Sequence, residues 1–169
     1  APKTDGATAL RRILHKRSPR FMAPSRAAQP KARRFTKLAL VGAGGVGGTI
    51  AHLAAMADMA HEIALIDIAP GLAAATALDL NHASGITQAT AQVTGSEDLA
   101  QVTGAEVVVV TAGRARRPGM SRADLIETNT RVIRATAEAI RTQAPSAVVI
   151  VVTNPLDEMT QAMLQATGF

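Results

Sequence analysis

The chain has 169 residues, 47% of them hydrophobic, which is enough for one domain with a sizeable core. It contains no cysteine, and this excludes disulfide bonds, a thiolate nucleophile and a cysteine-ligated zinc site. Charge is unevenly distributed: residues 1–37 hold eleven Lys or Arg and one acid, whereas residues 38–169 hold seven Arg, no Lys and twelve acids. The sequence therefore predicts a mildly acidic domain that follows a basic leader.

Residues 1–36 form this leader, which we expect to be disordered or to act as a transit peptide. The segment is rich in Arg, poor in acids and interrupted by four prolines, and residues 8–17 match a short basic amphipathic helix. Such a composition is typical of targeting to the mitochondrial matrix or another organelle, with the cytoplasm as the alternative location. An inert extension and a nucleic-acid-binding arm remain open. The leader has no recognisable binding module, so nucleic acid is not predicted as a partner.

From Lys37 onward, apolar strands alternate with helical stretches. This pattern predicts an α/β fold, a Rossmann-type doubly wound parallel sheet over residues 37–169. Strands are expected near 37–41, 62–66, 91–94, 107–111 and 147–152, and helices near 46–59, 72–84, 122–143 and 155–167. The runs 107–110 and 148–152 lack polar alternation, as expected of parallel strands covered on both faces. No apolar run approaches the roughly 20 residues that cross a bilayer, so no membrane association is predicted.

The first expected strand leads directly into a glycine-rich turn. Gly42, Gly44 and Gly47 occupy the three glycine positions of G-x-G-x-x-G. In that pattern the first glycine permits the tight turn, the second lets the backbone approach a pyrophosphate, and the third lets the helix pack close to the sheet. Asp67 follows Gly47 by 20 residues, where a carboxylate accepts hydrogen bonds from ribose hydroxyls and repels a 2′-phosphate. The sequence thus predicts an NAD site; glycines that serve packing alone are the alternative.

A second feature follows the strand expected at 107–111. Four of the nine residues 114–122 are arginines, and Pro118 and Gly119 interrupt them. Open α/β sheets bind ligands at the carboxyl ends of their strands, and Arg is suited to holding carboxylates in bidentate geometry. The loop is therefore interpreted as a mobile lid over an anionic substrate, and a solvated basic loop is the alternative.

Five motifs occur in order along the chain: GAGGVGGT at 42–49, ALDL at 77–80, VTAG at 110–113, RRPGMSR at 116–122 and VTNPLD at 152–157. Together they resemble the N-terminal half of the malate dehydrogenases of the lactate-dehydrogenase-like type, over about residues 37–169. The resemblance implies an NAD-dependent oxidoreductase of the tricarboxylic acid cycle that interconverts malate and oxaloacetate. It also implies a homo-oligomer when the protein is complete.

The resemblance implies roles for individual residues. Arg122 matches the lid arginine that polarises the substrate carbonyl during hydride transfer. Arg116 matches the position that pairs with the distal carboxylate; lactate enzymes carry Gln there, so Arg116 favours a dicarboxylate over pyruvate. Asn154 matches the residue that holds the substrate and the nicotinamide side of the cofactor. The remaining cofactor-binding positions are Thr111, Ala112, Gly113 and Asn129, the last of which is expected to be mainly structural.

The acid–base residues of the family lie in its C-terminal half, which would begin after Phe169. The chain has four histidines, His15, His52, His61 and His82. None is expected at the carboxyl end of a strand near the lid, so none is predicted to replace the catalytic base. We therefore expect a fragment without the C-terminal catalytic domain, inactive alone. An NAD-binding protein without turnover and a structural subunit of a larger assembly are the alternatives. No metal site is predicted, because no cluster has ligand spacing.

Overall fold

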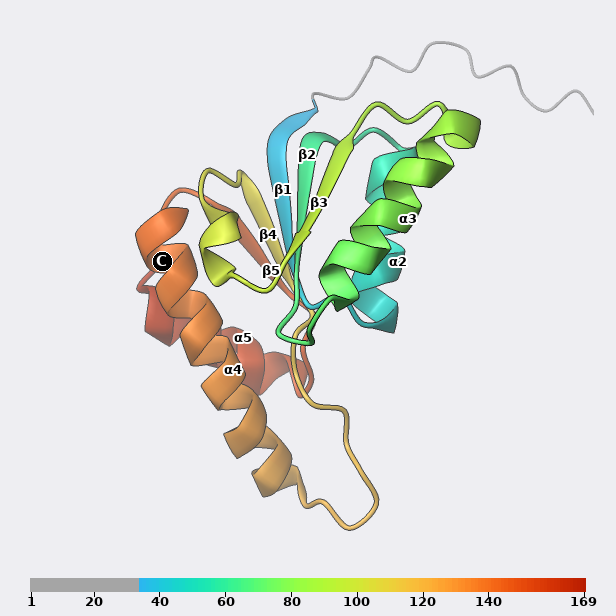
Figure 1. Cartoon of the computed structure of the whole chain (residues 1–169). Coiled ribbons are helices and arrows are strands. Elements are labelled where there is room, and N and C mark those ends of the chain that lie inside the picture. The colour runs from blue at the N-terminus through green and yellow to red at the C-terminus, as the bar shows by residue number, and fades with distance from the viewer. Residues whose placement is uncertain (1–33) are drawn as a thin grey trace, which may run out of the picture. The chain divides into compact units, whose positions relative to one another are not determined.

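The computed structural model describes residues 34–169, which form a five-stranded parallel sheet with helices on both faces (Figure 1). The strands are β1 (Phe35–Val41), β2 (Ala60–Ile66), β3 (Gln92–Ser96), β4 (Val107–Val110) and β5 (Val148–Val151). The helices are α2 (Gly45–Met56), α3 (Leu72–Thr87), α4 (Arg122–Gln143) and α5 (Leu156–Thr167), with a short 3₁₀ helix, η1 (Leu99–Val102). The predicted leader helix at 8–17 lies outside the described residues.

The strand order β3-β2-β1-β4-β5 is that of a doubly wound sheet, and it confirms the predicted Rossmann-type fold. Helices α2 and α3 cover one face of the sheet, and α4 and α5 cover the other (Figure 1). The winding changes direction between β1 and β4, which pair in parallel from Leu38 opposite Val107 to Val41 opposite Val110. The carboxyl ends of these two strands therefore lie next to each other, at the place where open α/β sheets bind ligands.

Small and branched aliphatic residues fill the core on both sides of the sheet. Ala51 and Ala54 of α2 pack with Leu40 and Leu65 on one face. On the other face, α4 and α5 contribute Ile133, Ile140 and Met159, each completely buried. Alanines on α2 allow this helix to lie close to the strands, because they add little thickness between the backbones.

Strand β5 departs from its predicted environment. Its run of aliphatic residues was expected to be covered on both faces, and this is wrong for the described part of the chain. Val149 and Val151 pack toward α4 and α5, but Val148 is 63% exposed and Ile150 is 48% exposed. An open apolar groove of about 1050 Å³ lies on this side, lined also by Ile50 of α2 and by parts of β1 and β4. The reason is that β5 is the edge strand and both of its neighbouring helices cover the same face.

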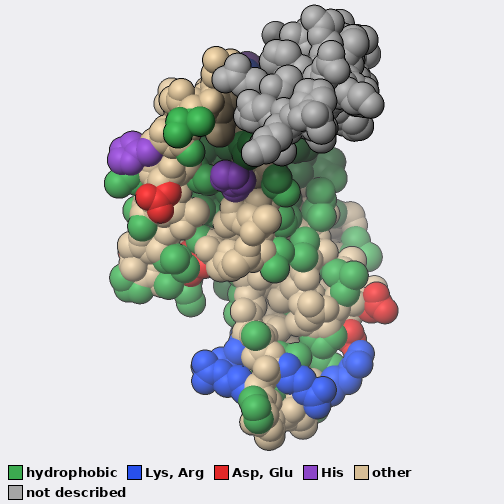
Figure 2. Space-filling model, turned by 90° about the vertical axis from the view of Figure 1, so that its right-hand side faces the viewer, with side chains coloured by type: hydrophobic (Ala, Val, Ile, Leu, Met, Phe, Trp, Pro, Cys, Tyr) green, Lys and Arg blue, Asp and Glu red, His purple; other side chains and the backbone are tan. Residues whose placement is uncertain are grey.

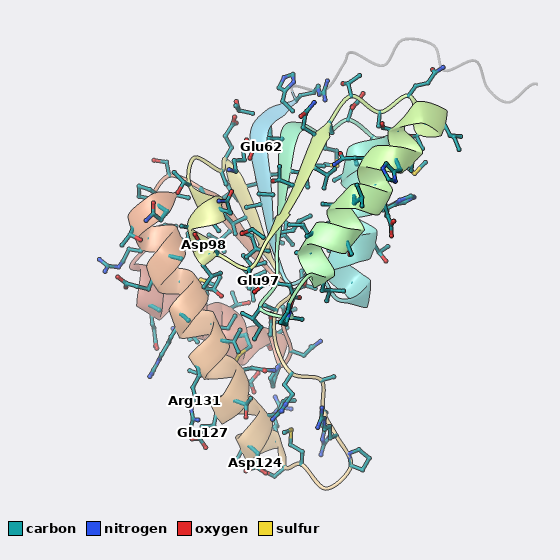
Figure 3. The ribbon with its side chains drawn as sticks, in the orientation of Figure 1. Glu62, Glu97, Asp98, Asp124, Glu127 and Arg131 are labelled. Atoms are coloured by element: carbon teal, nitrogen blue, oxygen red, sulfur yellow. The ribbon has the colours of Figure 1, made fainter. Side chains whose placement is uncertain are left out.

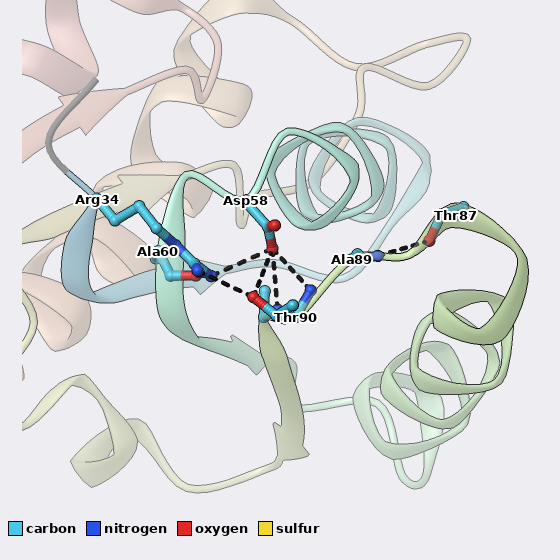
Figure 4. Close-up of polar contacts among 7 residues, drawn as sticks. Arg34, Asp58, Ala60, Thr87, Ala89 and Thr90 are labelled. Carbon is cyan, nitrogen blue, oxygen red and sulfur yellow. Dashed lines mark hydrogen bonds and ion pairs between the residues drawn. The ribbon is translucent and has the colours of Figure 1, made fainter. Parts of the chain in front are cut away.

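The amino-terminal edge of the sheet is held by a polar cluster around Asp58 (Figure 4). Helix α2 ends at Met56 rather than near residue 59, and Asp58 adopts a left-handed backbone conformation with φ of 51°. Oδ1 of Asp58 accepts hydrogen bonds from the backbone N–H of Thr90 at 2.8 Å and of Ala91 at 3.1 Å, and from Arg34 at 3.2 Å. These bonds, the one from Thr90 above all, lower the pKa of Asp58.

Candidate cofactor and substrate site

The predicted site residues gather at the carboxyl edge of the sheet. The glycine turn follows β1, Asp67 follows β2, the arginine loop (residues 112–121) follows β4, and Asn154 lies in the turn after β5. In Figure 1 the arginine loop extends below this edge, beneath the carboxyl end of β4. The parallel topology alone brings these four segments together, since the carboxyl ends of parallel strands share one edge.

The three glycines of the turn have different surroundings. Gly42 has φ of 109°, and a Cβ there would lie 2.5 Å from Oγ1 of Thr111. A Cβ on Gly47 would overlap the carbonyl oxygen of Gly42. These two glycines are required by the fold itself. A Cβ on Gly44, in contrast, would meet no atom of residues 34–169 within 4 Å, so the described fold does not need this glycine and leaves the space beside it open to a ligand.

Helix α2 begins beside that open space without any side-chain cap. Its N-cap is Gly44, no side chain of residues 34–169 caps its first turn, and no acidic residue lies in that turn. The first amides of a helix carry partial positive charge and need acceptors. A pyrophosphate at the start of α2 would supply both the acceptors and the negative charge. The glycine turn therefore fits the phosphate part of a dinucleotide.

Asp67 is attached to the glycine turn itself. Its Oδ2 accepts a hydrogen bond from the backbone N–H of Ala43 at 2.7 Å, and its Oδ1 accepts one from Ala69 at 2.9 Å. The half-buried carboxylate is thus fixed in orientation, while each oxygen keeps capacity for a further hydrogen bond. The sequence predicted Asp67 as a ribose ligand but not its hydrogen bond with Ala43, which joins the carboxyl ends of β1 and β2.

Residues 111–113 connect the turn after β1 to the turn after β5. Oγ1 of Thr111 donates to the carbonyl of Gly42 at 3.2 Å, and the backbone N–H of Ala112 donates to Val41 at 2.8 Å. A Cβ on Gly113 would lie 2.5 Å from the methyl group of Thr153, so the two turns are in close contact. The candidate cofactor-binding role of residues 111–113 stays a prediction, whereas their part in holding the site together is visible.

Asn129 of α4 is 1% exposed and uses its side chain to tie two loops. Its Oδ1 accepts from the backbone N–H of Arg114 at 2.7 Å, and its Nδ2 donates to the carbonyls of Arg114 at 3.2 Å and Asn154 at 2.7 Å. This geometry favours the structural role expected from the sequence. Contact of Asn129 or Asn154 with a cofactor stays a prediction.

The arginine loop is exposed over residues 113–119, and Figure 2 shows Lys and Arg side chains gathered at this end of the molecule. Nε of Arg116 donates to the carbonyl of Met120 at 3.3 Å, within the loop. Nη2 of Arg122 lies 2.5 Å from Oε1 of Glu158, the third residue of α5. This hydrogen bond lowers the pKa of Glu158 and raises that of Arg122. Both proposed substrate arginines therefore have a partner within the protein.

Helix α4 begins with a complete capping box, in contrast to α2. Oγ of Ser121 accepts from the backbone N–H of Asp124, and the Asp124 carboxylate accepts from the backbone N–H of Ser121, both at 3.1 Å. Figure 3 places Asp124 at the lower end of α4, where the loop enters the helix. The helix starts at Arg122 as the sequence predicts, because these two residues satisfy its end from within the chain.

No described histidine lies at this edge. His52 is in the middle of α2 and His82 is in α3, inside the helix rather than at its end. His61 is the second residue of β2, at the opposite end of that strand from Asp67. Within residues 34–169 no group of three or more His, Asp or Glu side chains is arranged to hold a metal ion. No helix in that range is long and apolar enough to cross a membrane.

Comparison with known proteins identifies the family of this domain. Residues 36–169 match the family described as lactate/malate dehydrogenase, NAD binding domain. The malate dehydrogenase of Syntrophotalea carbinolica is 47% identical over 133 residues, which cover 79% of this chain and 42% of that protein. The malate dehydrogenase of Caulobacter vibrioides is 46% identical over 132 residues, covering 78% of this chain and 41% of that protein. The chain therefore spans less than half the length of these relatives.

Solved structures show the same fold. The malate dehydrogenase from Archaeoglobus fulgidus in complex with NADH aligns with a TM-score of 0.75 at 43% identity, over 79% of this chain and 45% of that one. The lactate dehydrogenase from Cryptosporidium parvum, complexed with lactic acid and the NAD cofactor, also has a TM-score of 0.75, at 34% identity over 82% of this chain and 43% of that one. The glycine turn and Asp67 fit NAD, which is the cofactor of this domain. The chain belongs to the lactate/malate dehydrogenase family and carries its NAD-binding domain.

Proposed function

We propose that this chain is the cofactor-binding half of a malate dehydrogenase, which transfers a hydride between C2 of malate and the nicotinamide ring. The observation that carries the proposal is the convergence of three segments on one edge of the sheet. These are the open space beside Gly44, the fixed Asp67 carboxylate and the arginine loop. A dinucleotide and a small dianion are the ligands that such a set of groups would bind together.

The cofactor, when bound, accepts or supplies the hydride. The amides at the start of α2 would bind its pyrophosphate, and Asp67 would accept hydrogen bonds from the adenosine ribose while repelling a 2′-phosphate. Because Asp67 also holds the glycine turn through Ala43, the ribose and pyrophosphate sites are fixed relative to each other. Asn154, tied to α4 through Asn129, would hold the nicotinamide end next to the substrate.

The substrate would be bound by the arginine loop. Arg116 would pair with the distal carboxylate, and Arg122 would stabilise negative charge on the C2 oxygen as the hydride moves. Closure of the loop would bring both side chains in and exclude water. Removal of the hydroxyl proton needs a base, and we propose that it comes from a catalytic half homologous to the part of the relatives that this chain does not span.

Malate is favoured over lactate because of Arg116. A buried guanidinium without a carboxylate partner is costly, so a site built around Arg116 discriminates against a substrate with one carboxylate. The leader, by its composition, is proposed to direct the protein to an organelle matrix, and the complete enzyme is proposed to be a homo-oligomer. An NAD-binding protein without turnover is the other candidate, and the following experiment separates the two.

The test joins residues 34–169 to the C-terminal part of the Syntrophotalea carbinolica relative and measures NADH oxidation with oxaloacetate and with pyruvate. Calorimetric titration of the unfused chain with NADH and NADPH runs alongside. Tight binding of NADH together with oxaloacetate turnover supports the proposal. Binding of NADH with turnover of pyruvate alone would mean a lactate-type site. Binding without turnover, in a fusion that is folded by circular dichroism, would favour the non-catalytic alternative.

A further inference from the structure

Arg122, the residue at which the arginine loop enters α4, forms an ion pair with a different helix. Of the three arginines in the loop, Arg114 and Arg117 have no side-chain hydrogen bond or ion pair among residues 34–169, and Arg116 donates only to the loop backbone. Arg122 alone pairs with an acid, and that acid, Glu158, is 36 residues away on a different helix. The pair is thus a link between the end of the loop and α5.

The two ends of this link differ in rigidity. Glu158 precedes Met159, which is completely buried between α5 and the sheet, so its backbone is fixed by the core. Its side chain is 33% exposed, whereas that of Arg122 is 71% exposed and stands where the loop enters α4. A movable guanidinium is therefore held by a carboxylate on a rigid helix.

We propose that Glu158 is a positioning residue that occupies Arg122 while the loop is open and gives it up when a substrate oxygen takes its place. This inference rests on the proposed function, in which Arg122 faces the substrate. Glu158 offers the same chemical group that a carboxylate substrate offers, at hydrogen-bonding distance of 2.5 Å. Glu158 compensates the charge of the guanidinium and directs it along α5, so an anionic substrate competes with Glu158 for Arg122.

The strength of the pair suits such an exchange. Exposed ion pairs are weak and change an equilibrium by only about 1.5- to 5-fold. A buried pair would hold Arg122 too firmly for a ligand to displace it. The substitution Glu158→Gln keeps the size of the side chain and removes its charge. It should therefore raise the population of states in which Arg122 is not bound to Glu158 by about 1.5- to 5-fold.

The test uses the chain as it is and needs no turnover. Trypsin cuts after Arg122 only when its side chain is released and the first turn of α4 opens, and the bond after Arg116 in the arginine loop serves as an internal reference. Glu158→Gln is expected to raise the ratio of cleavage after Arg122 to cleavage after Arg116 by about 2- to 5-fold. The control Glu127→Gln breaks a pair with Arg131 that lies on α4 alone (Figure 3) and should leave the ratio unchanged.

A spectroscopic signature distinguishes positioning of Arg122 from a general loosening of the helices. NMR of the chain with ¹⁵N-labelled arginine observes the Nη hydrogens of Arg122, whose signals are assigned by their loss in Arg122→Lys. These hydrogens should give separate signals in the original chain, where Glu158 restricts rotation of the guanidinium. They should give one averaged signal in Glu158→Gln. Raising NaCl from about 0.05 to 0.5 M should average them without any mutation, since exposed pairs are screened. Averaged signals already in the original chain at low salt, or an unchanged cleavage ratio in Glu158→Gln, would overturn the proposal. Both readouts are independent of malate, so they stand even if the substrate is a different acid.

Discussion

Strands β1 and β4 lie side by side and each leads through a loop into a helix, but the two helices begin in opposite ways. The turn after β1 is built from buried backbone, and α2 starts with no side-chain cap. The loop after β4 is exposed, and α4 starts with a complete capping box while its arginine pairs with Glu158. The amides at the start of α2 are therefore free to bind a ligand, whereas those at the start of α4 are already capped. Arg122 must give up Glu158 before it can bind a ligand in the same way.

The largest effect is expected where the glycine turn contacts its own strand. Gly47→Ala places a Cβ on the carbonyl oxygen of Gly42, which cannot move without disturbing β1. We expect a loss of about 3 kcal/mol in the free energy of unfolding, measured by urea denaturation, and loss of NADH binding. Gly45→Ala is the control, because a Cβ there meets nothing within 4 Å and should leave stability unchanged or higher. Equal effects of the two substitutions would show that the turn is not tightly packed.

Asp67→Asn tests whether the glycine turn and the Asp67 carboxylate that is bonded to it also select the cofactor. The amide keeps the size of the side chain but removes its charge and one of the two oxygens that accept from Ala43 and Ala69 and that we propose accept from the ribose hydroxyls. We expect the affinity for NADH, measured by calorimetry, to fall by about 30-fold, or roughly 2 kcal/mol. The ratio of the affinity for NADH to that for NADPH should also decrease. Asp79→Asn, an exposed position on α3, should change neither value. If NADPH still binds as poorly as before, Asp67 does not provide the discrimination.

Arg116→Gln tests the proposed recognition of the substrate by the arginine loop. In the fusion with the catalytic half of the relative, we expect the ratio of kcat/KM for oxaloacetate to that for pyruvate to fall by about tenfold, or 1.4 kcal/mol. Arg117→Gln changes the neighbouring arginine, which makes no side-chain contact within the described residues. A ratio that is the same in both variants would mean that charge in the loop, rather than Arg116 itself, recognises the substrate.

Asp58→Asn gives a reference far from either loop, at the opposite edge of the sheet. Asparagine tolerates the left-handed backbone of this position but carries no charge for the bonds from Arg34 and Thr90. We expect about 1 kcal/mol lower stability at pH 7 and unchanged NADH affinity. Since folding lowers the pKa of Asp58, its contribution is complete above the ordinary aspartate pKa and is lost as pH falls through the folded value. The difference in the free energy of unfolding between Asp58→Asn and the original chain should therefore vanish in acid. A difference that stays constant with pH would contradict this explanation.

The sequence was most informative where a local signal fixes a local structure. Helix α4 was expected near residues 122–143 and spans Arg122–Gln143, and Ser121, a residue type that commonly caps helices, marks its start. The glycine spacing predicted the turn and its position after β1. The short η1 was missed, since four residues carry no periodic pattern.

What depends on distant partners could not be read from the sequence. The bond from Ala43 to Asp67, the tie from Asn129 to Asn154 and the pair of Arg122 with Glu158 each join residues far apart in the chain. Spacing along the chain does not determine such contacts, because they follow from the order of strands in the sheet. The open face of β5 was mispredicted for the same reason: an aliphatic run does not say which elements cover it.

That open face has a practical consequence. The outer edge of β5 presents backbone N–H and C=O groups with no neighbouring strand in the described part of the chain, next to the exposed side chains of Val148 and Ile150. Such an edge is a template for pairing between molecules. Purified alone, the chain is therefore expected to self-associate as its concentration rises. Its colloidal behaviour, rather than its affinity for the dinucleotide, will then limit how concentrated a sample can be studied.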